Sequence, residues 1–268
     1  MVRARIGARQ DADRLLLNRL DSPIFDPLRP ALARLPADRF PTHAELSAAA
    51  PGIVTSRGKP LRFVAPRDHT DRERRYYELH IAETGEVETR PDNWHDFFNA
   101  LAWITYPRAK SAINAQHAAI LGERGDAEAK RRGPERDALT LFDEGGVIVA
   151  TDDASLTKCI VDFEWKELFW RRRGQLEQRA RFFAFGHALF EKAVEPYLGI
   201  VAKTVFVPFA ADAQDADRLV AAHFADRAAF PRPKAMAPMP VLGVPGWHPD
   251  TARESFYDDP VHFRRKTE

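Results

Sequence analysis

The sequence has little of three things that would reveal its class directly. It contains one cysteine, Cys159, so it can form neither an internal disulfide nor a thiolate metal cage. Its 40 basic and 39 acidic residues leave a net charge of +1, which gives no global attraction to nucleic acid or to an acidic membrane. The apolar run Leu15–Leu17 is too short for a signal peptide, and no stretch approaches the roughly 18 apolar residues of a membrane span. These absences predict a cytoplasmic protein that is not inserted in a membrane, with Cys159 buried in its core rather than acting as a nucleophile.

Several catalytic signatures are also missing. The sequence has no phosphate-binding P-loop, no dinucleotide-binding glycine fingerprint, no His-Glu-x-x-His zinc motif and no Gly-x-Ser-x-Gly nucleophile elbow. The pair His95-Asp96 is similar to the paired residues of HD-type phosphohydrolases, but those folds are all-helical and hairpins are expected here. We therefore treat that pair as a coincidence and argue the chemistry from individual polar residues.

The chain does contain enough apolar residues for a core, since it is 44% hydrophobic and 29% charged. We expect a lead segment at 1–20 and a single globular domain at 21–268 with an extended proline-rich C-terminal segment. Eight prolines between 21 and 66 predict short helical turns, and Thr42 with Glu45 predicts a capping box. Trp247 is expected to be a buried anchor that keeps the C-terminal segment ordered.

The fold class is expected to be α+β, with antiparallel β-hairpins packed against several α-helices and a long aromatic-rich central helix. Alternating or β-branched runs predict strands at 61–65, 76–82, from 87, and at 204–207. A second hairpin is expected from strands at 138–142 and 147–150 around the glycine turn at 143–146.

Helical spacing and capping residues predict the helices. Pro107 should end one helix and open the next, because proline suits the first turn of a helix. The charged stretch 122–134 is interpreted as a solvated loop or a frayed helix end. The expected helices span 93–106, 107–121, 152–163, 175–194 and 215–226.

Five segments, which follow one another in this order along the chain, are similar to segments of one bacterial protein family. They are Asn93–Leu101 (NWHDFFNAL), Arg136–Glu144 (RDALTLFDE), Phe185–Glu191 (FGHALFE), Leu242–Trp247 (LGVPGW) and Phe256–Asp259 (FYDD). Through them the chain resembles DUF3025, a family of uncharacterised bacterial proteins, from about residue 20 to its end. The resemblance implies a bacterial cytosolic protein, and it brings no catalytic residues with it.

The helix expected at 93–106 carries polar residues on an otherwise apolar surface. His95 and Asn99 are four residues apart on one face, and Asp96 lies in the first turn, where the helix dipole favours a carboxylate. Buried polar groups must find partners, so these residues indicate a hydrogen-bond network or a site. The alternative is that Asp96 caps the helix and His95 covers Trp94.

The following helix repeats this pattern. Lys110, Asn114 and His117 fall at i, i+4 and i+7 on one stripe. Because only Pro107 separates the two helices, His95 and His117 could reach a common cleft. The alternative is a structural histidine whose hydrogen bonds are satisfied within the fold.

His187 and Glu191 share one face of the helix expected at 175–194. Their i, i+4 spacing suits two ligands of one metal, a histidine oriented by a carboxylate, or a plain surface ion pair. The phenylalanines around His187 indicate that it is buried, and Gly186 would permit the close approach of another backbone.

Two further groups of charged residues have alternative interpretations. Arg136 with Asp137 is either an anion-binding arginine held by a carboxylate or a strand-edge pair, and Asp143 is expected to bond the amides of the glycine turn. A basic-aromatic cluster could hold a nucleic-acid strand, but we favour a helix with buried aromatic residues and solvated arginines at its end. The cluster comprises Trp165, Lys166, Phe169, Trp170 and Arg171–Arg173.

Two functional classes remain open. The first is an enzyme, a hydrolase of a small molecule, which works with or without a divalent metal whose ligands stay unassigned. Its candidate catalytic residues are His95, Asp96, His117, His187 and Glu191, and its candidate substrate-binding residues are Asn99, Lys110, Asn114 and Arg136. The second is a non-catalytic binding protein, for nucleic acid through Arg171–Arg173. Convergence of the three histidines would favour the first class.

Overall fold

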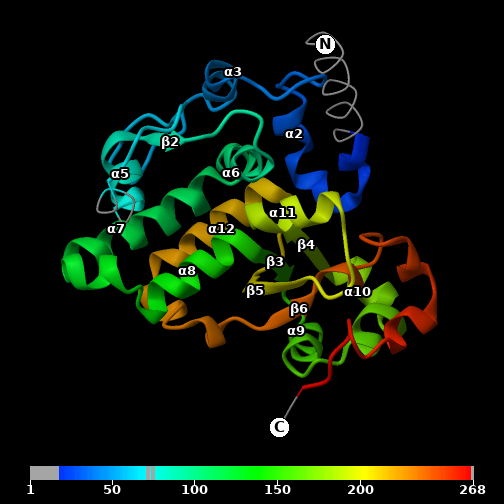
Figure 1. The fold of residues 1–268 in the computed structure, drawn as a ribbon. Coiled ribbons are helices and arrows are strands. Elements are labelled where there is room, and N and C mark those ends of the chain that lie inside the picture. The colour runs from blue at the N-terminus through cyan, green and yellow to red at the C-terminus, as the bar shows by residue number, and fades with distance from the viewer. Residues whose placement is uncertain (1–17, 71–72, 74–75, 267–268) are drawn as a thin grey trace.

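A four-stranded mixed sheet lies at the centre of the computed structural model, which describes residues 18–70, 73 and 76–266 (Figure 1). The strand order is β4-β3-β5-β6, and β3 runs antiparallel to β4 and parallel to β5. A separate two-stranded sheet pairs β1 with β2 in parallel. Most of the expected lead segment, residues 1–17, lies outside the described residues. The strands are β1 (Arg62–Val64), β2 (Glu86–Glu88), β3 (Gly146–Thr151), β4 (Ala180–Ala184), β5 (Val201–Val207) and β6 (Pro238–Pro240).

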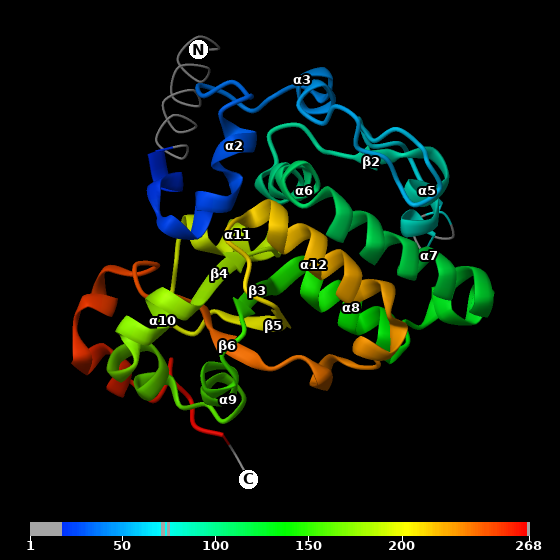
Figure 2. The same cartoon turned by 180° about the vertical axis from the view of Figure 1, so that it is seen from behind.

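Helices cover the central sheet on both sides (Figures 1 and 2). Helix α7 packs against α8 and α12, while α6 packs against α11. The α-helices are α2 (Arg29–Leu32), α3 (His43–Ala48), α5 (Tyr77–Thr84), α6 (Trp94–Thr105), α7 (Pro107–Lys130), α8 (Pro134–Gly145), α9 (Ala154–Val161), α10 (Arg173–Arg179), α11 (His187–Val194) and α12 (Ala213–Ala225).

Strand β3 separates two hydrophobic cores because its side chains alternate between the faces of the sheet. Val147 and Val149 belong to the first core, which α6, α11 and both ends of the chain complete. Ile148 and Ala150 belong to the second core, beneath α7, α8 and α12. Both faces are covered, so this strand is buried throughout and is apolar up to its last residue, Thr151, instead of alternating with polar residues.

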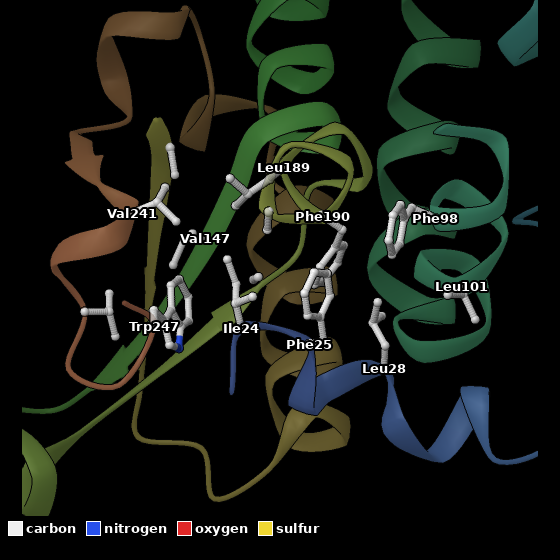
Figure 3. Close-up of a cluster of buried hydrophobic side chains, with 14 of the residues drawn as sticks. Ile24, Phe25, Leu28, Phe98, Leu101, Val147, Leu189, Phe190, Val241 and Trp247 are labelled. Atoms are coloured by element: carbon white, nitrogen blue, oxygen red, sulfur yellow. The ribbon is translucent and has the colours of Figure 1, made fainter. Parts of the chain in front are cut away.

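The proline-rich N-terminal region forms short turns over the first core, as predicted. A 3₁₀ helix at Pro23–Leu28 inserts Phe25 beside Phe98 of α6 and Phe190 of α11, with ring centroids 6.0 Å away in each case (Figure 3). The capping box of Thr42 and Glu45 is present at the start of α3.

The C-terminal segment wraps the other end of the first core. Trp247 is 8% exposed and joins that core, which confirms its expected role as an anchor (Figure 3). The side-chain N–H of Trp165 donates to the carbonyl of Arg264 at 2.8 Å and ties this segment to the π-helix Glu167–Arg171 and its neighbours.

The mixture of helices and strands is confirmed, but the expected antiparallel hairpins are wrong. Residues 138–142 belong to α8, which runs directly into β3. Pro134 opens α8, and the buried Ala138, Leu139 and Phe142 fall at helical spacing. Residues 76–82 also form a helix, α5: the adjacent residues Ile81 and Ala82 are both buried, whereas a strand would place them on opposite faces.

The expected long central helix at 175–194 is also wrong. Its sequence forms α10, then β4, then α11. Residues 180–184 pair with β3 in an antiparallel ladder, and that non-local pairing overrides the helical spacing of Phe182 and its neighbours. Helix α7 extends to Lys130, beyond the end expected at 121, but its backbone is kinked at Gly125. The helices expected at 93–106, 152–163 and 215–226 are confirmed with shifts of a few residues, with Asn93 and Asp153 as caps for the first two.

Candidate functional site

A cavity of about 550 Å³ lies among α5, α6, α7, α8 and the start of α11. Eight of the nine candidate residues named above line it, and only Glu191 does not. The structure therefore brings the three histidines of three different helices to one polar cavity. The other side chains that line it include Arg67, His69, Tyr77, Glu78, Glu88, Arg90, Trp103, Arg132, Thr140 and Glu144.

Two facing stripes of side chains, one on α7 and one on α8, make two pairs along the cavity wall. At one pair, Lys110 Nζ lies 2.6 and 2.8 Å from the carboxylate oxygens of Asp143. At the other, Nε of Arg136 donates to Nδ1 of His117 at 3.3 Å. Lys110 and His117 are two turns apart on α7, and Arg136 and Asp143 are two turns apart on α8. The cavity thus has a His187 end, at Lys110 and Asp143, and an Arg136 end.

Gly186 determines where His187 lies. A Cβ atom on Gly186 would be 2.4 Å from the carbonyl oxygen of Glu144, so only glycine allows the start of α11 to approach the end of α8 so closely. The predicted close approach is therefore confirmed. It places Nδ1 of His187 2.8 Å from the carbonyl oxygen of Asp143 and 3.5 Å from that residue's carboxylate. Asp143 is thus a helix-end residue that meets Lys110 and His187, and its expected role in a glycine turn is wrong.

His95 meets His187 across the cavity. Their Nε2 atoms are 3.2 Å apart, and Nδ1 of His95 lies 3.0 Å from a carboxylate oxygen of Glu191. All three alternatives expected from the sequence, shared metal ligands, an orienting carboxylate or a surface ion pair, paired Glu191 with His187 on one helix. Instead, the two side chains of α11 contact opposite nitrogens of the His95 ring, which α6 contributes.

The hydrogen-bond partner of His187 assigns one of its protons. A carbonyl oxygen only accepts, so Nδ1 of His187 carries a proton. In the neutral ring Nε2 then has a lone pair, to which Nε2 of His95 can donate. The other nitrogen of His95, Nδ1, lies within hydrogen-bond distance of Glu191.

Burial sets the protonation of the inner groups. The side chain of His187 is 8% exposed, and burial lowers its pKa to about 4 although Asp143 opposes the shift. Burial is the largest influence on Asp143 and opposes its ionisation, but the charge and hydrogen bond of Lys110, together with the neighbouring histidines, outweigh burial and lower the pKa of this carboxyl. Near neutral pH, His187 is therefore an uncharged base beside a charged carboxylate–ammonium pair.

The Arg136 end is built differently. Arg136 is buried, and its Nη1 donates to the carbonyl of Glu128 at 3.2 Å, so both of its bonds go to uncharged atoms. Burial, and then the charge of Arg136, lowers the pKa of His117 to about 3, so this histidine is neutral too. The interpretation of Arg136 as half of a strand-edge pair is wrong, because the residue lies on a helix and faces the cavity.

Two other candidates, Asp96 and Asn99, have structural partners. Asp96 accepts from the backbone N–H of Arg90 and from two atoms of its guanidinium, at 2.7 to 2.9 Å. Asn93, rather than Asp96, caps α6. Asn99 accepts from Lys110 at 2.9 Å and helps to hold that ammonium group.

Glu78 is a site residue that the sequence reasoning missed. Its carboxylate and its backbone carbonyl accept from the side-chain amide of Asn114, at 2.7 and 2.8 Å. Burial, and then repulsion by Asp143, raises the pKa of Glu78. The residue was overlooked because α5 was interpreted as a strand that would have placed Glu78 with His80 on the face away from the core.

The basic-aromatic cluster lies outside this cavity. Arg171 and Arg172 both pair with Glu167, and Arg173 bonds the hydroxyl of Tyr257 at 3.1 Å. Trp165 is buried in the first core. The inward packing of the aromatic residues is therefore confirmed, but Arg173 is part-buried and bonded instead of solvated. Cys159 is also in that core, and burial raises the pKa of its thiol to about 11, as expected for a structural cysteine.

Two further observations concern metal binding and membrane insertion. Within the described residues, no group of three or more histidine, cysteine, aspartate or glutamate side chains is arranged to hold a metal ion. No helix in the described part of the chain is long and apolar enough to cross a membrane.

Comparison with known proteins identifies the family. Residues 61–267 match the model of a family described as a protein of unknown function, DUF3025. The chain belongs to the DUF3025 family. No curated protein and no solved structure matches it. Every residue that lines the cavity lies within the range of the DUF3025 match, so the family segment builds the whole site.

Proposed function

We propose that this DUF3025 protein is an enzyme, a hydrolase that acts on a small polar molecule in the cavity, with His187 as the general base. The observation that carries the proposal is the position of the His187 ring. Its Nδ1–H is held by the Asp143 carbonyl, so its unprotonated Nε2 points towards His95 in the cavity. A neutral, oriented imidazole is the group that general-base catalysis needs.

His95 supplies the complementary acid. It is the more exposed ring of the pair, with 36% of its side chain accessible, so a substrate can displace it from His187. Once the pair is open, Nε2 of His187 accepts a proton from the attacking water, and Nε2 of His95 gives its proton to the leaving group. Glu191 orients the His95 ring through its Nδ1, and Asp143, which is paired with Lys110, holds the base through its backbone carbonyl.

The experiment is hydrolysis of a panel of p-nitrophenyl carboxylate and phosphate esters by the wild type, His187→Gln and His95→Gln. His43→Gln is the control, because His43 bonds the carbonyl of Thr89 outside the cavity. Removal of a general base typically lowers the rate by about 10²–10⁴-fold, so we expect at least a hundredfold loss in His187→Gln and no loss in the control. Equal rates in the wild type and His187→Gln, or no turnover of any ester by the wild type, would overturn the proposal.

The premise about His187 can be measured without a substrate. A two-dimensional ¹⁵N spectrum of the imidazole nitrogens should show His187 with its proton on Nδ1 at pH 7. A proton on Nε2 would contradict the geometry on which the proposed base depends.

A further inference from the structure

Arg136 is a buried cation without an anionic partner. It is 6% exposed, and no carboxylate among residues 18–70, 73 and 76–266 lies within ion-pair distance of its guanidinium group. Its Nε and Nη1 bond uncharged atoms, and its Nη2 donates to none of the described residues. The carboxylates of Glu128, Glu78 and Asp137 attract this charge only from beyond ion-pair distance, so the buried cation still favours binding of an anion.

The other cations on the cavity wall are already paired. Arg90 binds Asp96, and Lys110 binds Asp143. Arg67 lies 2.8 Å from Glu86.

Arg132 lines the same cavity as Arg136 and is only weakly paired with a carboxylate. Its Nε is 4.0 Å from Asp137, and almost half of its side chain is exposed. Burial, and then the charge of Arg132, lowers the pKa of Arg136, which means that the two guanidinium groups repel each other. An anion between or beside them would relieve that repulsion.

His117 adds a neutral donor at the same end. Its Nδ1 accepts from Arg136, so its remaining proton is on Nε2, which donates to no described residue. Glu78 also lines the cavity, but burial raises its pKa and favours its uncharged form. It therefore does not remove the preference of the Arg136 end for an anion.

We propose that the Arg136 end of the cavity binds the anionic group, a carboxylate or a phosphate, of an elongated small molecule whose reacting bond lies at His187. The inference rests on the proposed function for the position of the reacting bond. Lys110 lies at the His187 end of the cavity, and His117 lies at the Arg136 end. Seven residues at 1.5 Å each separate them on α7, so the anionic group and the reacting bond are about 10 Å apart.

The test is calorimetric titration of the full chain with inorganic phosphate and with succinate, which separates the two sources of anion. We expect one of them to bind and Arg136→Gln to weaken it at least tenfold. Arg131→Gln is the matched control, because Arg131 is exposed and does not line the cavity. If Arg136→Gln fails to fold, Arg132→Gln decides the question, and a several-fold loss of affinity is expected.

The outcomes separate this inference from the proposed function. Binding that persists in His187→Gln but weakens in Arg136→Gln supports the anion site even if no ester is hydrolysed. Absence of binding by both probes, or equal affinity in the wild type and the folded arginine variants, would overturn the anion site whatever the hydrolysis assay shows.

Discussion

The two ends of the cavity are built from the same pair of helices, yet they satisfy their charges differently. At the His187 end a buried ammonium and a partly buried carboxylate neutralise each other, 2.6 Å apart. At the Arg136 end a buried guanidinium bonds only a neutral imidazole and a carbonyl. The paired end is suited to fixed catalytic groups, whereas the unpaired end still has bonding capacity for a ligand. The comparison shows that the chemistry of a polar wall depends on which of its charges remain without a counter-ion.

The largest change in unfolding free energy is expected when the Lys110–Asp143 pair is broken, because the His187 end then also holds a buried cation without a counter-ion. Asp143→Ala leaves Lys110 buried without its counter-ion, and breaking a buried pair in this way costs about 3–5 kcal/mol of unfolding free energy. Urea denaturation followed by circular dichroism measures this change. Asp137→Ala is the control on the same helix, because Asp137 is about half exposed and should lose less than about 1 kcal/mol. Similar losses in both variants would show that the Lys110–Asp143 pair is not stabilising.

Gly186→Ala tests whether the His187 end depends on close backbone packing. A methyl group there would collide with the carbonyl of Glu144, and overpacking of this kind costs about 1–3 kcal/mol. We also expect His187 to move away from Asp143, which a changed ¹⁵N shift of its imidazole would report. Gly174→Ala is the control, since nothing lies within 4 Å of a Cβ there and alanine suits the first turn of α10. A stable variant with an unchanged His187 signal would contradict this explanation.

The neutral histidines at both ends predict a common dependence of stability on pH. Burial lowers the pKa of His187 to about 4 and that of His117 to about 3, whereas unfolded histidine titrates near 6.5. Below about pH 6.5 the unfolded chain therefore binds protons that the folded chain does not, and stability falls as the pH decreases towards 4. Each such histidine contributes about 1.4 kcal/mol per pH unit within that window and nothing above it.

His187→Gln and His117→Gln should each reduce this slope by one proton equivalent. Urea unfolding at pH 7.5, 6.0 and 5.0 measures the slope, and both variants should share the flat region of the wild type above neutral pH. A slope that neither substitution reduces would mean that these histidines are charged in the folded protein.

The smallest expected effect extends the comparison to the basic-aromatic cluster. The Arg171 side chain is 65% exposed and its partner is Glu167, so Arg171→Ala should change the unfolding free energy by less than about 1 kcal/mol. Because these arginines already have partners, we also expect no salt-dependent binding of single-stranded DNA by the wild type. Tight, salt-sensitive binding that Arg171→Ala weakens would overturn this expectation.

The stripe on α7 could be predicted from the sequence because helical spacing is a local property. Lys110, Asn114 and His117 repeat at i, i+4 and i+7, and Pro107 fixes where the helix starts. The facing stripe could not be recognised, because the glycines at the end of α8 suggested a hairpin turn. Without α8 as a helix, the pairing of Arg136 with His117 was not foreseeable.

The partners of His187 could not be predicted from the sequence, for a different reason. Asp143 and His95 reach it through non-local packing, and they lie 44 and 92 positions away along the chain. Only Gly186 gave local information, because a glycine predicts that another backbone can approach closely. It does not predict which backbone that is. Likewise, residues 180–184 could be assigned to the sheet only once β3 was available as their partner.

The wrapping of the C-terminal segment has a consequence for synthesis of the protein. All residues that line the cavity precede residue 188, so the ribosome has made the whole site well before the chain is finished. The first core, however, needs Val241, Trp247 and Tyr257, which emerge later. Until they emerge, the part of the first core that these residues cover stays open on the nascent chain and exposes apolar surface to other proteins. Translation that stops near residue 240 would therefore release a chain with a complete set of cavity residues and a strong tendency to aggregate.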